Sequence, residues 1–202
     1  MKRGACQVFY KEVIEFMADK IKVLGIPGSL RRASYNRGLL RAAQALLPED
    51  MDLDIYDISG IPLFNEDLIP DSVPEAVKDF KSRIADADAL LFASPEYNFS
   101  IAGVLKNAID WASRPAKESP LNDKPIAIMG AGGIGGTARS QAHLRLVATF
   151  TNMHPLNKPE VLVQRAWEKF DADGNLTDEQ TRQNVRNMLV ALDAWTRRLK
   201  GC

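Results

Sequence analysis

Cysteine and histidine are scarce in this chain. The two cysteines, Cys6 and Cys202, lie at its two ends, and the two histidines, His143 and His154, lack the spacing of metal ligands. This arrangement is neither a disulfide framework nor a C-x-x-C redox or zinc motif. We therefore expect no metal site.

Long apolar runs and an excess of one charge are also missing. No run approaches the roughly 20 apolar residues of a membrane span, and the N-terminus has no signal-peptide pattern. Lys and Arg together number 26, as do Asp and Glu, so there is no general electrostatic footprint for nucleic acid. With 202 residues, 46% of them apolar, the chain is expected to be a cytoplasmic globular protein without nucleic-acid or membrane partners.

The chain divides into a short extension and one domain. Residues 1–20 carry only a weak helical pattern, and we interpret them as an N-terminal extension that is partly disordered. Residues 21–202 are enough for a single domain with a substantial core.

Apolar runs of strand length alternate with segments of helical period throughout this domain. The runs lie at 21–26, 51–56, 89–94, 125–130 and 160–164. Ser72 with Glu75, and Thr177 with Gln180, have the spacing of capping boxes at the starts of the second and last helices. Five strands alternating with five helices predict a doubly wound α/β fold, in which a five-stranded parallel sheet has helices on both faces.

The loop after the first strand has the composition of a phosphate site. In such sheets, ligands bind outside the carboxyl ends of the strands, at the point where the strand order reverses. Ser29, Arg31, Ser34 and Asn36 supply hydroxyl, guanidinium and amide donors immediately before a helix. No G-K-[ST] follows, which disfavours a nucleoside triphosphatase. The alternative is that Ser34 or Asn36 is a plain helix cap beside solvated arginines.

The loop after the third strand suits a flat ligand. Glu96, Tyr97 and Asn98 place an acceptor, an aromatic plane and an amide within one turn, a set that could hold a heterocycle by its rim and face. The alternative is a simple turn with an exposed tyrosine.

The turn after the fourth strand is rich in glycine. Gly130, Gly132 and Gly135 match G-x-G-x-x-G, but a dinucleotide fingerprint belongs on the first strand and needs an acidic residue about 20 positions on. The first acidic residue is Glu160, 25 positions beyond Gly135. We assign these glycines to close approach against a planar ligand.

The histidine and tryptophan residues have less specific interpretations. His143 has no neighbouring nucleophile motif, so we expect it on a helix surface or at an interface. Trp111, Trp167 and Trp195 are expected in the core or at an interface.

Three motifs taken together resemble those of one family. They read G-S-L-R-x-x-S-x-N after the first strand, P-E-Y-N-x-S-x-x-G-x-L-K-N-A-I-D-W after the third, and A-R-x-Q-x-x-L-R after the fourth. With them the chain resembles the NAD(P)H-dependent FMN reductase family, nearest its bacterial quinone and chromate reductases, from Ile21 to Lys200.

The resemblance implies a flavodoxin-like fold with strand order 2-1-3-4-5 and FMN at the switch point. The residues that it implies for cofactor binding are Ser29, Arg31, Ser34 and Asn36 at the phosphate, and Pro95, Glu96, Tyr97, Asn98, Gly132 and Gly133 at the ring. It also implies a homodimer or homotetramer, with Lys106, Asn107, Asp110 and Trp111 near a partner chain.

The implied chemistry belongs to FMN, with no catalytic residue from the protein. NADPH or NADH would pass a hydride to FMN, which would then reduce quinones, chromate or similar small acceptors by two electrons. We expect Arg114, with Arg31 or Arg32, to attract anionic substrates. The alternatives are a flavodoxin-type electron carrier without nicotinamide activity and a nucleotide-binding regulatory module.

Overall fold

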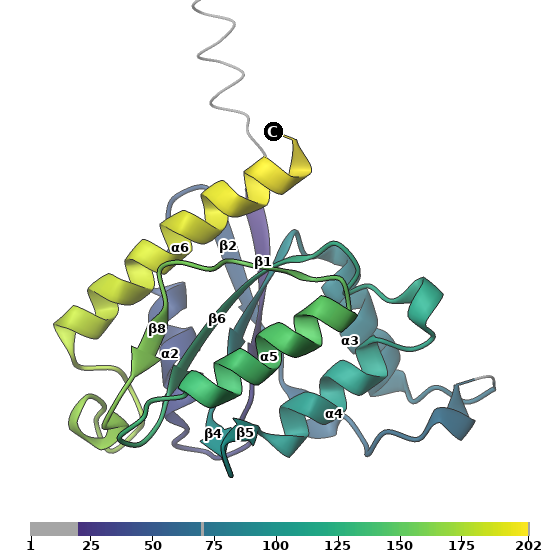
Figure 1. Cartoon of the computed structure of the whole chain (residues 1–202), viewed down its shortest axis with the longest axis horizontal. Coiled ribbons are helices and arrows are strands. Elements are labelled where there is room, and N and C mark those ends of the chain that lie inside the picture. Colours follow the sequence, from purple (N-terminus) through teal and green to yellow (C-terminus); the bar gives the residue numbers. More distant parts are fainter. Residues whose placement is uncertain (1–19, 70, 202) are drawn as a thin grey trace, which may run out of the picture.

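The computed structural model describes residues 20–69 and 71–201 (Figure 1). The predicted extension at 1–20 lies outside this range, apart from Lys20, whose ammonium group is 3.2 Å from the carboxylate of Asp52. Within the described residues, no helix is both long and apolar enough to cross a membrane.

A parallel sheet runs through the middle of the molecule. Its strands are β1 (Ile21–Pro27), β2 (Met51–Ile55), β3 (Ala89–Ala93), β6 (Pro125–Ala131), β7 (His154–Pro155) and β8 (Val161–Val163). The order is β2-β1-β3-β6, and both β7 and β8 pair with the free edge of β6. This confirms the predicted order, with one difference: two short pieces share the fifth position, and the predicted strand at 160–164 corresponds to the second piece.

Five helices cover the two faces of the sheet in the described part of the chain. They are α2 (Tyr35–Gln44), α3 (Glu75–Asp86), α4 (Gly103–Ala112), α5 (Ala138–Phe150) and α6 (Glu179–Lys200). Short 3₁₀ turns lie at Ile58–Gly60, Glu66–Leu68, Ala116–Glu118 and Ala166–Glu168. A separate antiparallel hairpin, β4 (Glu96–Tyr97) with β5 (Ser100–Ile101), lies at the lower edge in Figure 1, near the first turns of α4 and α5.

Alternation along each strand divides the core in two. On β1, Val23 belongs to the cluster that α2 and α6 cover, whereas Leu24 and Ile26 belong to the cluster under α3, α4 and α5. Because successive side chains of a strand point to opposite faces, a run that is apolar throughout can fill both clusters. The continuous apolar runs of the sequence are therefore explained by a sheet that is covered on both sides.

Two helices begin differently from the sequence prediction. Helix α3 starts directly after Pro74 and has no side-chain cap, so Ser72 and Glu75 do not form a capping box. The ring of Pro74 clashes with a helical conformation of the residue before it, so Val73 stays outside the helix. At α6 the cap is Asp178, whose carboxylate accepts from the Thr181 N–H.

Candidate functional site

The carboxyl ends of β1, β3 and β6 bring three loops together. Pro27 is in register with Ala93, and Ala93 with Met129, so the segments that follow these residues begin side by side. The Gly28 N–H donates to the Ala93 carbonyl at 2.8 Å. A Cβ on Gly28 would lie 2.7 Å from the ring of Pro95, so glycine is required where the first two loops meet.

These loops enclose a first cavity of about 210 Å³. It is lined by Ser29, Arg31, Ser34, Tyr35, Asn36, Pro95, Glu96, Tyr97, Ala131, Gly132, Gly133 and Trp167. The lining includes every residue predicted for cofactor binding except Asn98, which lines an adjoining cavity. The structure thus gathers residues that lie as far apart in sequence as Ser29 and Trp167.

Hydrogen-bond donors are concentrated at the α2 end of this cavity. The Oγ atoms of Ser29 and Ser34 accept from the N–H groups of Arg31 and Arg37, at 3.3 Å each, which leaves both hydroxyl hydrogens to donate. Ser34 is also the N-cap of α2, so the capping interpretation and the phosphate interpretation describe the same residue. Together with Arg31 and the positive end of the α2 dipole, these groups favour an anion.

Asn36 connects two of the loops. Its amide nitrogen donates to the Ala131 carbonyl at 2.9 Å, and its amide oxygen accepts from the Ala131 N–H at 3.0 Å, both in the buried interior. The side chain therefore fixes the start of α2 to the end of β6, in addition to lining the cavity.

The segment after β3 is a tight hairpin, whereas its sequence predicts a loop. Asn98 and Phe99 form its turn with φ values of 50° and 62°, in the left-handed region that asparagine tolerates better than phenylalanine does. The Glu96 carboxylate accepts from the N–H groups of Arg139 and Ser140, at 2.9 and 3.2 Å, and so caps α5 from a different element. Its side chain is one-tenth exposed and also forms an ion pair with Arg139 at 3.2 Å.

The glycines at the end of β6 and in the turn after it have two different roles. A Cβ at Gly130 would overlap with Thr137 and with the Ser94 carbonyl, and one at Gly132 would lie 2.5 Å from the Gly136 carbonyl. These glycines permit close approach of protein backbone, whereas the prediction assigned that approach to a ligand. Gly133 differs, because a Cβ there would meet no protein atom within 4 Å.

A second cavity of about 580 Å³ adjoins the first and shares Glu96 and Gly133 with it. Its lining residues are Glu96, Asn98, Phe99, Gly133, Ile134, Gly135, Gly136 and Arg139. His143 lies nearby on the exposed surface of α5, as predicted, and its Nδ1 is 2.9 Å from the Ser100 hydroxyl of the hairpin.

Three residues that line the first cavity were not predicted: Tyr35, Ala131 and Trp167. Trp167 is the most distant of them in sequence. It follows β8, and the N–H groups of Arg165 and Ala166 donate to the carbonyls of Gly133 and Gly132 at 3.0 Å, which holds the Trp167 segment against the glycine turn. Trp167 is 55% exposed, which excludes the core alternative; the interface alternative stays a prediction. By contrast, Trp111 is buried as predicted. No sequence motif marks the loop after the fifth strand.

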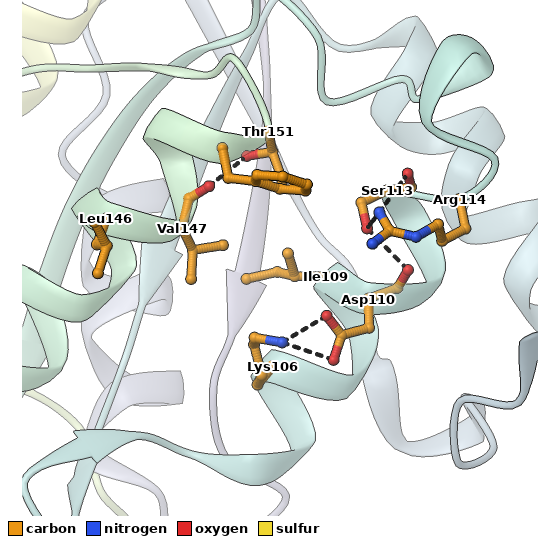
Figure 2. Close-up of a pocket in the computed structure, with 9 residues that line it drawn as sticks. Lys106, Ile109, Asp110, Ser113, Arg114, Leu146, Val147 and Thr151 are labelled. Carbon is orange, nitrogen blue, oxygen red and sulfur yellow. Dashed lines mark hydrogen bonds and ion pairs between the residues drawn. The ribbon is translucent and has the colours of Figure 1, made fainter.

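The structure does not bring Arg114 to either cavity. Arg114 follows the last turn of α4 and bonds to the Ser113 hydroxyl at 3.2 Å, beside a separate hollow between α4 and α5 (Figure 2). Lys106 and Asp110 pair with each other in the same hollow. Arg31 and Arg114, which were both predicted to attract anionic substrates, therefore line two different hollows of the chain.

Asn107 and Trp111 have contacts within the subunit. The Asn107 amide and the Trp111 indole both donate to the Pro62 carbonyl, at 2.8 and 2.9 Å, and Phe64 packs edge-on against Trp111. The two side chains thus hold the loop after β2 on α4. Of the residues expected near a partner chain, Lys106 and Asp110 face the α4–α5 hollow.

The first cavity fits an FMN molecule in its chemistry. Donor hydroxyls and a helix N-terminus suit a phosphate, Tyr97 and Trp167 supply aromatic surface, and the open position at Gly133 leaves room beside the turn. A parallel sheet of this order, with its ligand cavity at the carboxyl ends of β1 and β3, defines the flavodoxin-like class, and the lining of the cavity suits a flavin.

Comparison with known proteins shows the family. Residues 21–168 match the profile described as NADPH-dependent FMN reductase, and the chain belongs to this family. An NAD(P)H-dependent FMN reductase of Pseudomonas aeruginosa is 55% identical over 186 residues, covering 92% of this chain and 100% of the relative. An NAD(P)H:quinone oxidoreductase of Solanum tuberosum is 49% identical over 187 residues, covering 90% and 95%.

A solved structure agrees with these relatives. The flavoenzyme NAD(P)H:(acceptor) oxidoreductase FerB of Paracoccus denitrificans superposes with a TM-score of 0.80 and 35% identity, covering 88% of this chain and 98% of FerB. The predicted fold class, the enzyme class and the cofactors FMN and NAD(P)H are confirmed. The protein is an FMN-dependent NAD(P)H reductase, and the electron-carrier alternative is not favoured.

Proposed function

We propose that this reductase passes electron pairs from NAD(P)H to quinone-class acceptors. The observation that carries the proposal is the pair of adjoining cavities, which share Glu96 and Gly133. The first has the donors for a phosphate, and the second opens beside it with room for a second flat molecule. Bound FMN supplies the redox chemistry, since it accepts a hydride from NAD(P)H and returns two electrons to an acceptor. The similarity to named quinone oxidoreductases supports this acceptor class.

In this proposal the chain binds and orients FMN and takes no part in proton transfer. Ser29, Arg31 and Ser34 hold the phosphate, while Asn36 keeps the phosphate loop at a fixed distance from the glycine turn. Tyr97 and Gly133 face the ring, together with the other residues predicted there: Pro95, Glu96, Asn98 and Gly132. Chromate as a further acceptor and the cytoplasm as the location stay predictions.

We also propose that the chain forms a homodimer or homotetramer through the α4–α5 face. Leu146 and Phe150 on α5 are 71% and 76% exposed, and they border the hollow that Lys106 and Asp110 also line. One turn of helix separates the two apolar side chains, so they form a continuous apolar stripe. We place this pair of exposed side chains at the centre of the proposed interface.

The test of the proposed function is an anaerobic titration of the FMN-loaded protein with NADPH, followed by visible absorbance. We expect the oxidised flavin absorbance to bleach in one phase, without semiquinone absorbance, and to return when a quinone is added. Flavin that dithionite bleaches but NADPH does not would contradict the proposal. The same titration with NADH determines the preferred donor.

A further inference from the structure

The second cavity carries a cationic group that no sequence motif assigned to substrate. Arg139, on the first turn of α5, lines this cavity, and its side chain is 54% exposed. Its guanidinium carbon lies 3.9 Å from the centre of the Phe99 ring, within the range of a cation–π contact. Arg139 thus occupies a place in the site that the sequence analysis gave to Arg114.

The charge of Arg139 is not cancelled by its neighbour. The Glu96 carboxylate, which pairs with Arg139, also accepts from two backbone N–H groups at the N-terminus of α5. That terminus carries about half a positive charge. One carboxylate therefore faces about one and a half positive charges, and the cavity wall keeps a positive excess.

Apolar surface lies beside this charge. Phe99 and Ile134 line the same cavity and are 65% and 76% exposed. Phe99 is held in its left-handed turn conformation at the hairpin tip, and Arg139 stacks on it. An exposed ring and an exposed aliphatic side chain around a guanidinium group form a site for a flat apolar molecule with one negative charge.

We propose that the second cavity binds anionic aromatic acceptors, that is, quinones that carry an ionised hydroxyl or carboxyl group, and that Arg139 determines this preference. The inference rests on the proposed function, because it names the acceptor class for the same site. Phe99 and Ile134 contact the flat ring system, and Arg139 contacts the anionic substituent.

Binding of redox-inert probes to the oxidised, FMN-loaded protein tests this proposal without turnover. The probes are 2-naphthoate and 2-naphthamide, which have the same ring system and differ in charge, and calorimetry gives each dissociation constant. We expect the wild-type protein to bind the naphthoate about tenfold more tightly, as for a charge-assisted hydrogen bond. Arg139→Gln removes this difference, whereas Arg139→Lys keeps part of it.

Two further variants control for indirect effects. Arg186→Gln removes an exposed arginine on α6, whose side chain bonds to Gln183, and leaves the tenfold ratio unchanged. Phe99→Asn is compatible with the left-handed backbone conformation of the turn. We expect it to weaken the binding of both probes equally, because it removes the aromatic ring and leaves the charge of Arg139.

The proposal is overturned if the wild-type protein binds both probes equally, or if Arg139→Gln keeps the ratio. It is also overturned if Arg139→Gln weakens FMN binding tenfold, since Arg139 would then hold the cofactor. Bleaching by NADPH is measured on the same samples, so a failure of this inference is distinguished from a failure of the proposed function. Should Arg139→Gln fold poorly, Arg139→Met is the second neutral variant, and it too is expected to remove the difference between the probes.

Discussion

At the scale of single residues, Gly130 near the end of β6 and Gly133 in the turn after it differ in the space around them. A Cβ at Gly130 would overlap with the Ser94 carbonyl and with Thr137, and backbone atoms cannot move aside cheaply. We expect Gly130→Ala to lower the free energy of unfolding by about 3 kcal/mol. Equilibrium urea denaturation measures this loss.

Gly133→Ala is the matched variant. A Cβ there meets no protein atom within 4 Å, so we expect stability within about 0.5 kcal/mol of the wild type. Because Gly133 lines both cavities, the same substitution is expected to weaken FMN binding about tenfold, or about 1.4 kcal/mol. Unchanged FMN affinity, measured by flavin fluorescence titration, would show that the ring does not approach this position.

The Asn36 side chain leads to a second prediction at the residue scale. Asn36→Ala removes both bonds to Ala131 and leaves a buried N–H and a buried carbonyl without their partner. We expect a loss of about 3 kcal/mol in the free energy of unfolding. The control is Asn184→Ala on exposed α6, expected within about 0.5 kcal/mol of the wild type by the same denaturation. A loss below 1 kcal/mol at Asn36 would contradict the structural role given to it here.

At the scale of elements, the start of α6 gives a pH dependence. The hydrogen bond from the Thr181 hydroxyl lowers the pKa of Asp178 below its usual value of 3.8, and Lys169 acts in the same direction. A carboxyl group whose pKa is lower in the folded state stabilises the protein at pH values above its unfolded-state pKa. This stabilisation is lost as the pH falls through the folded-state pKa.

Asp178→Asn tests this sign. Asparagine still caps a helix, but its side chain carries no charge. We therefore expect the free energy of unfolding of the variant to be about 1 kcal/mol below that of the wild type at pH 7, and this difference to shrink below about pH 4. Urea denaturation between pH 2.5 and 7 measures it, with Asp173→Asn in the neighbouring turn as the control. A difference independent of pH would assign the effect to cap geometry alone.

The elements also show how far sequence patterns reach. Continuous apolar runs and helical stripes predicted the order of strands and helices, because both faces of this sheet are covered. The start of α3 was predicted wrongly, since Pro74 excludes Val73 from the helix whatever the capping pattern. At α6, the Thr177 hydroxyl donates to the Lys169 carbonyl, a tertiary contact that short-range spacing does not contain.

The site shows the same limit. Motifs after three strands that are neighbours in the sheet, β1, β3 and β6, identified most of the lining of the first cavity, because parallel topology brings those strand ends together. Trp167 was missed because its place depends on backbone bonds between the loop after β8 and the glycine turn. Within one chain the length of α4 separates Arg114 from the hairpin, so its predicted contact with substrate stays a prediction.

At the scale of the whole molecule, the α4–α5 face predicts how copies associate. Phe150→Glu places a charge in the apolar stripe, and we expect the solution mass to fall toward the 22.4 kDa of one chain. Light scattering coupled to size exclusion measures the mass. Val190→Glu, on α6 and also exposed, is expected to leave it unchanged. A wild-type protein that is already monomeric, or a variant that keeps the wild-type mass, would contradict the proposed interface.

The position of Trp167 has an optical consequence. Trp111 is buried beneath the loop after β2, and the Trp195 indole donates to the His154 carbonyl at the amino-terminal end of the sheet, so one tryptophan of the three lies in the first cavity. Indole emission overlaps flavin absorption, and quenching of this kind strengthens steeply as the two rings approach. The fluorescence of Trp167 is therefore expected to fall as FMN binds, so tryptophan emission reports how much of the protein carries its cofactor before any substrate is added.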